Sequence, residues 1–411
     1  MPTSNNLLVD FSAVDNKSGS IELGATVMDS YTQALLLSRN TRGGGGVLDI
    51  AAVLGGVLDA AAGGGFSDDL QDVVDRLGNL YAPERVKALE EINTTSTATV
   101  GSSVAIRVGN SFGRVTQNRI AALTRSGHLT GFAAGDPVGE ESWWLQPYGS
   151  TGSQDDKGGI AGYGSDSRGL VLGFDKAISP QWRAGLAVSY ANTDIDANTG
   201  NQSVDIDTYQ IAVYGTRELA PDTRLNAQAG VGWFQYDSRR SIPSLDRIAE
   251  ASYDGANLRG TLSLEKDYRI SADAMAHANL SMEYNYVEVD GYAENGAGAL
   301  GLKVPDTDQD SLILGIGGEY RHALSGNGSL GLRGMVGYDA LADQSSVRTQ
   351  LVAGGAAFTT QGMAPERFLF RGGVGYEFSL KDNLSVDIRY DTELRRGFDD
   401  HAASVKLKYV Y

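Results

Sequence analysis

The chain has 411 residues, of which 53 are glycine, 19 are tyrosine and none is cysteine. The lack of cysteine excludes disulfides, thiolate metal sites and cysteine nucleophiles. A formal net charge of −17 argues against nucleic-acid binding, which requires a basic surface. There is no apolar run long enough for a membrane-spanning helix, and the first residues lack the pattern of a signal peptide. An exported protein with this beginning would be a mature chain or a fragment.

The sequence is mixed up to about residue 140. Short apolar stretches in residues 5–40 favour strands. Two segments with helical spacing follow between glycine clusters, residues 47–58 and residues 70–77. Asp68 and Asp69 suit the N-terminus of the second segment, because acidic side chains are stabilised there. We therefore expect two helices in this part of the chain.

A third helix of small, polar and basic residues is predicted from Val104 to Arg125. Its 22 residues would span about 33 Å at about 1.5 Å per residue. Arginines are spread along it instead of gathering on one side: Arg107, Arg114, Arg119 and Arg125. Such a helix does not suit a dry core. It suits either a wet, enclosed channel or plain solvent.

From Trp143 onward, apolar and polar residues alternate in about 12 runs, as in β-strands with one apolar face. In the run that begins at Trp182, Leu186 and Tyr190 share a face opposite Arg183. The last run, DHAASVKLKYVY, alternates in the same way to the end of the sequence. One parity carries Val405, Leu407, Tyr409 and Tyr411, and the other carries Lys406 and Lys408.

A soluble sandwich also alternates, but these runs exceed the usual five or six residues of globular strands. Aromatic residues collect near the ends of the apolar face, and charges of both signs occupy the polar face. Short connections alternate with longer ones at residues 153–166, 193–202, 238–250, 290–307 and 341–365. Outer-membrane barrels have this asymmetry of turns and loops. We therefore predict an all-β transmembrane barrel of about 12 antiparallel strands, with both ends on the short-turn side.

Three stretches resemble the autotransporters of Gram-negative bacteria (type Va secretion). ESWWLQPYGSTGSQ resembles the start of the family's first barrel strand, and the following hairpin matches its Gly-x-x-x-Gly-x-Asp pattern at Gly169, Gly173 and Asp175. The alanine- and glycine-rich stretch of residues 51–115, with ALEEI near its middle, resembles the junction between passenger and barrel. The order and spacing of the motifs are more specific than any one of them, and the resemblance covers about residues 20–411.

The resemblance implies a 12-stranded outer-membrane barrel threaded by an α-helix, which exports a passenger to the cell surface. It divides the chain into a passenger remnant (1–65), a junction with the lumen helix (66–140) and the barrel (141–411). Enclosed charges need partners, so the helix arginines would meet inward-facing acids, unless the helix is instead solvated. The candidate acids are Glu265, Glu283, Glu377 and Asp387.

Two departures from the family also set expectations. Some members cut themselves beside an Asn-Asn pair in the helix, whereas Asn110 and Asn118 are isolated here, so we expect no self-cleavage. The usual large passenger is absent, so the chain would be a C-terminal portion of a longer protein or a member with a very small passenger. In the family, the last strand is read by the barrel assembly machinery, which predicts an assembly signal in Val405, Leu407, Tyr409 and Tyr411.

The expected partners are outer-membrane lipid and lipopolysaccharide, the assembly machinery and the chain's own passenger segment, with a monomeric barrel and no cofactor or metal. Two alternatives remain open. A porin-like channel would have an open lumen. A barrel hydrolase would use His277, which falls on the inward face near Ser281 and Glu283. Because the helix would fill that lumen, a satisfied interior histidine is the preferred interpretation, and we expect no enzyme.

Overall fold

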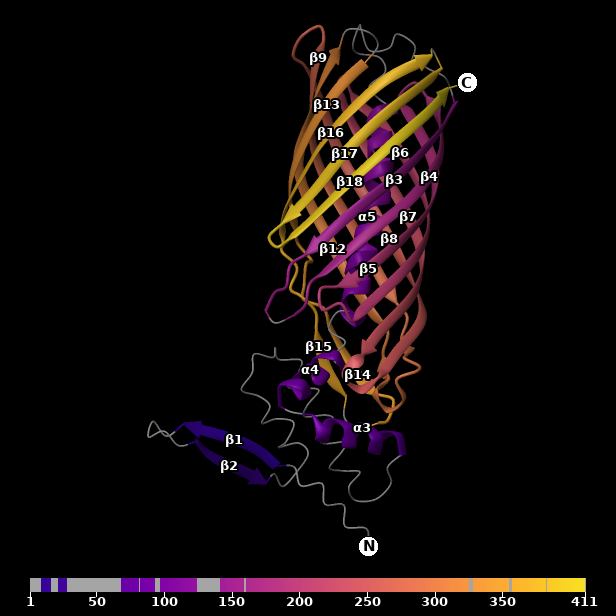
Figure 1. Ribbon diagram of the computed structural model, residues 1–411. Coiled ribbons are helices and arrows are strands. Elements are labelled where there is room, and N and C mark those ends of the chain that lie inside the picture. Colours follow the sequence, from indigo (N-terminus) through magenta and orange to yellow (C-terminus); the bar gives the residue numbers. More distant parts are fainter. Residues whose placement is uncertain are drawn as a thin grey trace.

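The computed structural model describes residues 9–15, 21–27, 68–80, 82–92, 97–123, 141–158, 160–324, 328–354, 357–381 and 383–410. Twelve antiparallel strands form a closed barrel (Figure 1), which confirms the predicted fold. They are β3 (Glu141–Gln154), β4 (Tyr163–Ser179), β5 (Trp182–Ala197), β6 (Gln202–Ala220), β7 (Thr223–Ile242), β8 (Arg247–Arg269), β9 (Ala274–Val289), β12 (Thr307–Leu324), β13 (Gly328–Asp339), β16 (Phe368–Lys381), β17 (Leu384–Arg395) and β18 (Phe398–Val410). The barrel closes where β18 pairs with β3.

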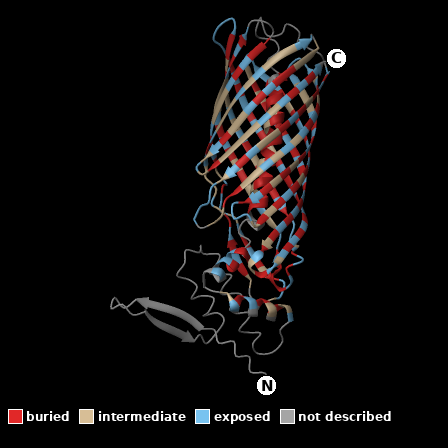
Figure 2. Ribbon diagram, in the orientation of Figure 1, coloured by how far each residue is buried: buried red, intermediate tan, exposed pale blue. Residues whose placement is uncertain are grey.

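The two faces of the barrel follow the alternation in the sequence. Figure 2 shows buried and exposed residues in turn along the strands. On β5, Leu186 and Val188 are exposed on the outside, while Ala187 and Ser189 are buried inside. The apolar outer face of such a barrel is covered by lipid, so it needs no second layer of protein.

Aromatic side chains form two belts around the apolar face. At the long-loop end, the ring centroids of Tyr190 and Tyr209 lie 5.3 Å apart. At the short-turn end, those of Trp143 and Phe174 lie 4.9 Å apart. Such belts mark the two membrane–water interfaces of a transmembrane barrel.

Connections at one end are short turns, including residues 180–181, 221–222 and 270–273. At the other end, two predicted long loops, 193–202 and 238–250, are largely strand, because β5, β7 and β8 continue through residues 193–197, 238–242 and 247–250. This prediction was wrong because strands that leave the bilayer no longer need an apolar face. The sequence of these strand segments therefore lacks the alternation that would have predicted strands.

The two longest connections, β9–β12 and β13–β16, build a small sheet of their own. It contains β10 (Tyr292–Ala293), β11 (Leu302–Val304), β14 (Ser346–Leu351) and β15 (Phe358–Gln361), in that order. Among the described residues, two 3₁₀ turns lie in the connections at the long-loop end, η2 (Pro243–Leu245) and η3 (Gly298–Leu300). Separately, β1 (Val9–Asp15) and β2 (Ile21–Val27) form an antiparallel hairpin.

In the described ranges, three helices precede the barrel: α3 (Asp68–Asn79), α4 (Ala82–Ile92) and α5 (Thr97–Leu123). None of the helices in the described ranges is long and apolar enough to cross a membrane. Helix α3 confirms the prediction for residues 70–77, whereas the predicted helix over 47–58 lies outside the described residues. Helix α5 runs inside the barrel (Figure 1) and begins seven residues before the predicted Val104. Its small and polar first turns carry no apolar periodicity, which is why sequence reasoning missed them.

Candidate functional site

The lumen and helix α5 form the candidate site, and the C-terminal part of the helix is fixed by a buried ion pair. Arg119 Nε and Nη2 each lie 2.7 Å from an oxygen of Asp175 on β4, and the two side chains are 0 % and 2 % exposed. The carboxylate also accepts hydrogen bonds from Ser142 Oγ (2.5 Å) and Tyr214 OH (2.9 Å). Trp144 Nε1 in turn donates to Tyr214 OH at 2.8 Å. Bidentate pairing with further donors is the geometry that compensates a buried carboxylate.

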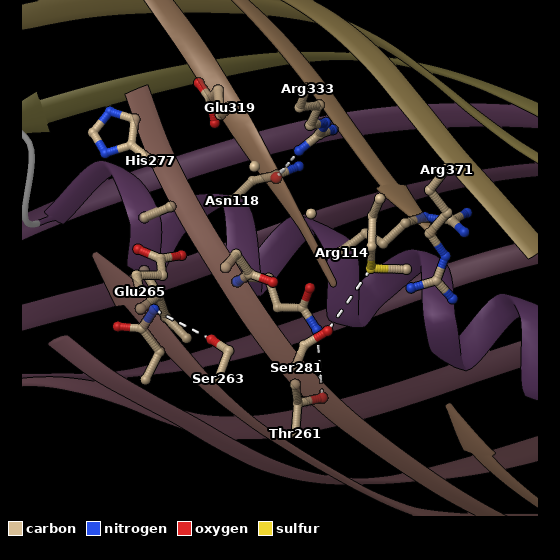
Figure 3. Close-up of a pocket in the computed structure, with 18 of the residues that line it drawn as sticks. Arg114, Asn118, Thr261, Ser263, Glu265, His277, Ser281, Glu319, Arg333 and Arg371 are labelled. Carbon is tan, nitrogen blue, oxygen red and sulfur yellow. Dashed lines mark hydrogen bonds between the residues drawn. The ribbon is translucent and has the colours of Figure 1, made fainter. Parts of the chain in front are cut away.

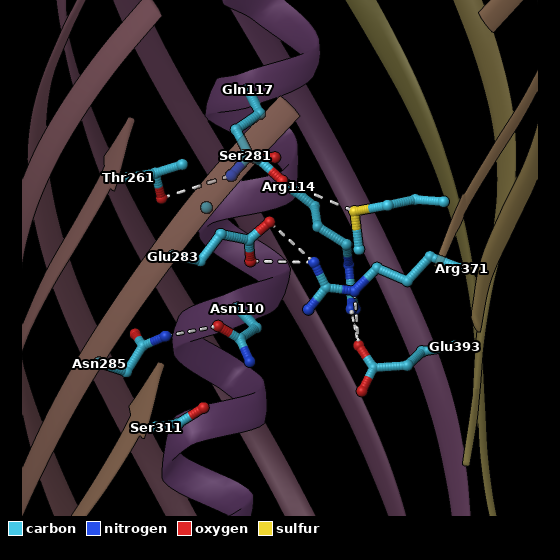
Figure 4. A network of polar contacts seen from close by, with 12 residues as sticks. Asn110, Arg114, Gln117, Thr261, Ser281, Glu283, Asn285, Ser311, Arg371 and Glu393 are labelled. Atoms are coloured by element: carbon cyan, nitrogen blue, oxygen red, sulfur yellow. Dashed lines mark hydrogen bonds and ion pairs between the residues drawn. The ribbon is translucent and has the colours of Figure 1, made fainter. Parts of the chain in front are cut away.

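A chain of charges crosses the lumen beside the middle of the helix (Figure 4). Arg114 lies 3.1 Å from Asp400 and 3.4 Å from Glu393, on β18 and β17. Arg371 on β16 pairs with the same Glu393 at 2.8 Å and with Glu283 on β9 at 2.9 Å. These alternating charges therefore join the helix to two parts of the barrel wall, the adjacent strands β16, β17 and β18 and the more distant β9.

Glycines on α5 allow one barrel arginine to reach the helix backbone. Arg259 Nη1 on β8 donates to the carbonyl oxygen of Gly109 at 2.6 Å. One turn further along, a Cβ at Gly113 would lie 1.4 Å from the same Nη1. The guanidinium thus occupies the space left by a missing side chain, and any larger residue at position 113 must displace it.

We expect Gly113→Ala to lower the free energy of unfolding by about 1–3 kcal/mol, the usual cost of overpacking. In an Arg259→Ala background the same change should cost less than about 1 kcal/mol, because the clashing group is gone. Gly101→Ala is the matched control, since its Cβ would meet Tyr236 at an ordinary 3.5 Å. Urea unfolding in detergent micelles measures all four variants. Equal costs of Gly113→Ala in both backgrounds would refute the assigned contact.

The outer part of the helix makes weaker contacts. The Arg107 guanidinium lies 3.8 Å from the ring centre of Phe398 and 5.3 Å from that of Tyr163. Asn110 accepts a hydrogen bond from Asn285 at 2.8 Å. Cation–π contacts of this kind contribute about 0.5–2 kcal/mol, so the ion pairs deeper in the lumen dominate the retention of the helix.

A polar cavity of about 140 Å³ remains between α5 and the wall (Figure 3). Its lining includes Arg114, Glu265, His277 and Arg371. His277 Nδ1 lies 2.6 Å from Asp267 Oδ1, while its Nε2 has no hydrogen-bond partner among the described residues. The cavity is large and polar enough to hold water. Among the described residues, no hydroxyl group lies within hydrogen-bond distance of His277 Nε2.

Comparison with known proteins identifies the barrel. The family model described as the autotransporter beta-domain matches residues 143–391, more than half of the chain. The chain belongs to the autotransporter β-domain family. It is an outer-membrane translocator domain, with its short turns in the periplasm and its long loops at the cell surface.

Named relatives agree with the autotransporter assignment. The chain is 27 % identical over 246 residues to Esterase EstA of Pseudomonas aeruginosa, which covers 58 % of this chain and 37 % of the relative. It is 24 % identical over 208 residues to Outer membrane protein B of Rickettsia prowazekii, covering 47 % of this chain and 12 % of that protein. The chain thus spans well under half the length of either relative.

The fold is shared with a solved autotransporter structure, the translocator domain of NalP from Neisseria meningitidis. The TM-score is 0.62 at 16 % identity, over 77 % of this chain and 100 % of that one. Identity this low shows the fold alone. The translocator fold is a non-enzymatic one.

The structure places the predicted residues of this autotransporter inside the lumen but pairs them differently. All four expected acids lie beside barrel cations. The pairs are Glu265 with Arg224 (3.6 Å), Glu283 with Arg371 (2.9 Å), Glu377 with Arg321 (2.8 Å), and Asp387 with Lys406 (2.8 Å) and Arg389 (2.8 Å). The prediction that these acids pair with the helix arginines is corrected, because other strands of the barrel wall bring a cation closer than the central helix does. Arg125 lies outside the described residues.

The acids that do meet the helix are Asp175, Glu393 and Asp400, and sequence reasoning gave none of them this role. Asp175 is the last position of the Gly-x-x-x-Gly-x-Asp pattern, but this pattern does not predict which residue Asp175 pairs with. Glu393 and Asp400 flank the outer turn between β17 and β18, where polar residues give no sign of facing inward.

The last strand has the facing predicted for it. Val405, Leu407 and Tyr409 are exposed on the lipid side. Lys406 and Lys408 are buried on the lumen side. Tyr411 lies outside the described residues.

Proposed function

We propose that the barrel carries the segment before α5 through the outer membrane to the cell surface and then keeps α5 in the lumen as a plug. One observation carries this proposal: α5 runs the length of the lumen and makes contacts at several depths. Ser103 near its start bonds Gln309 at the outer beginning of β12 (3.2 Å), and Arg119 near its end pairs with Asp175 toward the periplasmic end of β4. Residues before Thr97 therefore leave the lumen on the side of the long loops.

The mechanism needs no nucleotide or metal. We propose that the chain crosses through the barrel during or after assembly, and that folding of the exported segment outside makes the movement unidirectional. The charged lumen wall gives a solvated path for the polar chain, since its cations and anions already neutralise one another. We further propose a monomeric barrel held by lipid and lipopolysaccharide, with a structural and not a catalytic role for His277.

An epitope tag at the start of the exported chain tests translocation. We expect an antibody to bind this tag on intact cells, while the same tag placed in the turn at residues 180–181 should react only after the outer membrane is opened. Heat-modified migration on gels checks that both proteins contain a folded barrel. A folded barrel whose N-terminal tag stays hidden on intact cells would contradict export.

The cavity beside α5 favours one second candidate, a passive channel. Planar-bilayer conductance separates it from the plug. We expect the whole chain to conduct weakly and a chain lacking residues 97–123 to conduct several times more, because the helix fills most of the lumen. A large, steady conductance that this deletion leaves unchanged would favour the channel.

A further inference from the structure

Helices α3 and α4 are docked on the long connections at the cell-surface mouth of the barrel (Figure 1). Helices α3 and α4 share a buried apolar cluster with η2, η3 and the small sheet formed by β10, β11, β14 and β15. Val73 and Leu89 from the helices are 0 % and 1 % exposed, and Leu351 on β14 is 1 % exposed. The helices thus cover a surface that the outer connections build, and we call this surface the outer platform.

Arg240 near the end of β7 fixes the C-terminus of α4 to the outer platform. Its side chain is fully buried, and all five of its N–H groups have acceptors. Nη1 donates to the carbonyl oxygens of Glu91 (3.5 Å) and Ile92 (3.1 Å), the last two residues of α4. Nε and Nη2 bind the carboxylate of Glu294, and Nη2 also binds the Leu300 carbonyl oxygen at 3.1 Å. A cation at this position is favourable, because the free carbonyls of a helix C-terminus carry negative charge.

A second arginine fixes the start of α3. Arg247 at the beginning of β8 lies 2.7 Å from Asp69 and 3.2 Å from Asp72. Asp69 also accepts the backbone N–H of Ala299 at 2.6 Å. The Arg247 guanidinium holds the pKa of the Asp69 carboxyl below its ordinary value, so this carboxyl stays ionised at neutral pH. Two separate clamps, one at each end of the α3–α4 pair, therefore hold the segment.

We infer that the outer platform is a receptor for residues 68–92, and that their docking is a latch that closes the outer mouth after export. Three outer connections build the platform, so it is complete only in a finished barrel. Its ligand is a segment that reaches this side only by crossing the lumen. Arg240 binds α4 at Ile92, five residues before α5 begins at Thr97, so α5 cannot slide toward the periplasm without pulling Glu91 and Ile92 off a buried guanidinium. This inference rests on the proposed export function.

Trypsin treatment of intact cells tests the latch in the full-length chain with its N-terminal tag. Lys87 lies in α4 with an exposed side chain, but cleavage there requires local unfolding. We expect Arg240→Gln to speed cleavage within residues 68–92 at least tenfold. Arg239→Gln is the matched control. Arg239 is next to Arg240 in the sequence, but its side chain is exposed and pairs with the exposed Glu250. We expect trypsin to cleave this variant at the wild-type rate.

Ala88→Asp provides a second variant that leaves the barrel sequence untouched. Ala88 is completely buried in the cluster, so a carboxylate there should release α4 and speed cleavage as Arg240→Gln does. This variant decides the question if Arg240→Gln fails to give a heat-modifiable barrel. Wild-type cleavage rates in a folded Arg240→Gln barrel and in Ala88→Asp would overturn the latch. A failure of export is distinguishable, because the tag is then absent from the surface of wild-type cells as well.

Discussion

Asp175→Ala is expected to lower the free energy of unfolding of the barrel by about 3–5 kcal/mol, the usual cost of removing one partner of a buried ion pair. Arg119 would then remain in the lumen without its bidentate acceptor. Ser142 and Tyr214, which now donate to the carboxylate, would lose their acceptor too. The loss therefore reaches the helix and two strands together, which explains the large size of the effect.

Urea unfolding in detergent micelles measures this change, and Trp144 beside the pair gives a fluorescence signal. Lys176→Ala is the matched control on the same strand, because its ion pair with Glu141 is about half exposed on both sides. Exposed pairs contribute about 0–1 kcal/mol. A second readout is conductance, which should rise in Asp175→Ala as α5 loosens. Similar stabilities for Asp175→Ala and Lys176→Ala would show that this pair does not hold the helix.

Deleting residues 409–411 is expected to abolish assembly of the barrel into the outer membrane. Tyr409 pairs with Trp143 and Val410 with Ser142 at the seam where the last strand closes on the first. The truncation opens this seam at the periplasmic end and removes an aromatic side chain from the belt there. We propose that the assembly machinery recognises the outward face of Val405, Leu407 and Tyr409 together with the last residue of the sequence, Tyr411.

Membrane fractionation with heat-modifiability on gels measures this outcome, and we expect the truncated protein to be degraded or to remain in the periplasm. His401→Ala, at the outer end of the same strand, should assemble normally and serves as the control. Tyr409→Ser separates the two causes, because it keeps the backbone seam and removes only the aromatic ring. Normal insertion of the truncated chain would contradict both the seam and the signal.

Much of this architecture could be predicted from the sequence, because lipid imposes a strict period on the strands. Leu186 and Val188 had to point outward, and Lys406 inward, once the barrel was inferred. The partners of the helix could not be predicted in the same way. Arg119 and Asp175 are 56 residues apart and Arg114 and Asp400 are 286 apart. Which of these residues meet depends on the tilt and stagger of the strands, which the alternation does not reveal.

The outer platform was missed for a related reason. Beyond the aromatic belts, neither face of a strand is obliged to be apolar, so the alternation fades while the strands continue. Helix α4 left little signal because its buried side is short, with Ala88, Leu89 and Ile92 as its core contacts. Strand β7, for example, has a lipid-facing pattern around Trp233, but no change in its sequence pattern indicates that Arg240 further along is buried.

The path of α5 also decides whether the chain crosses the membrane an even or an odd number of times. Twelve strands joined by hairpins make an even number of passes, and an even number returns both ends of a barrel to the same side. Helix α5 adds a single further pass, so the total is odd (Figure 1). Thr97 and Val410 consequently lie at opposite mouths of the barrel. Because of this one helix, the start of α5 and the end of β18 face two different compartments.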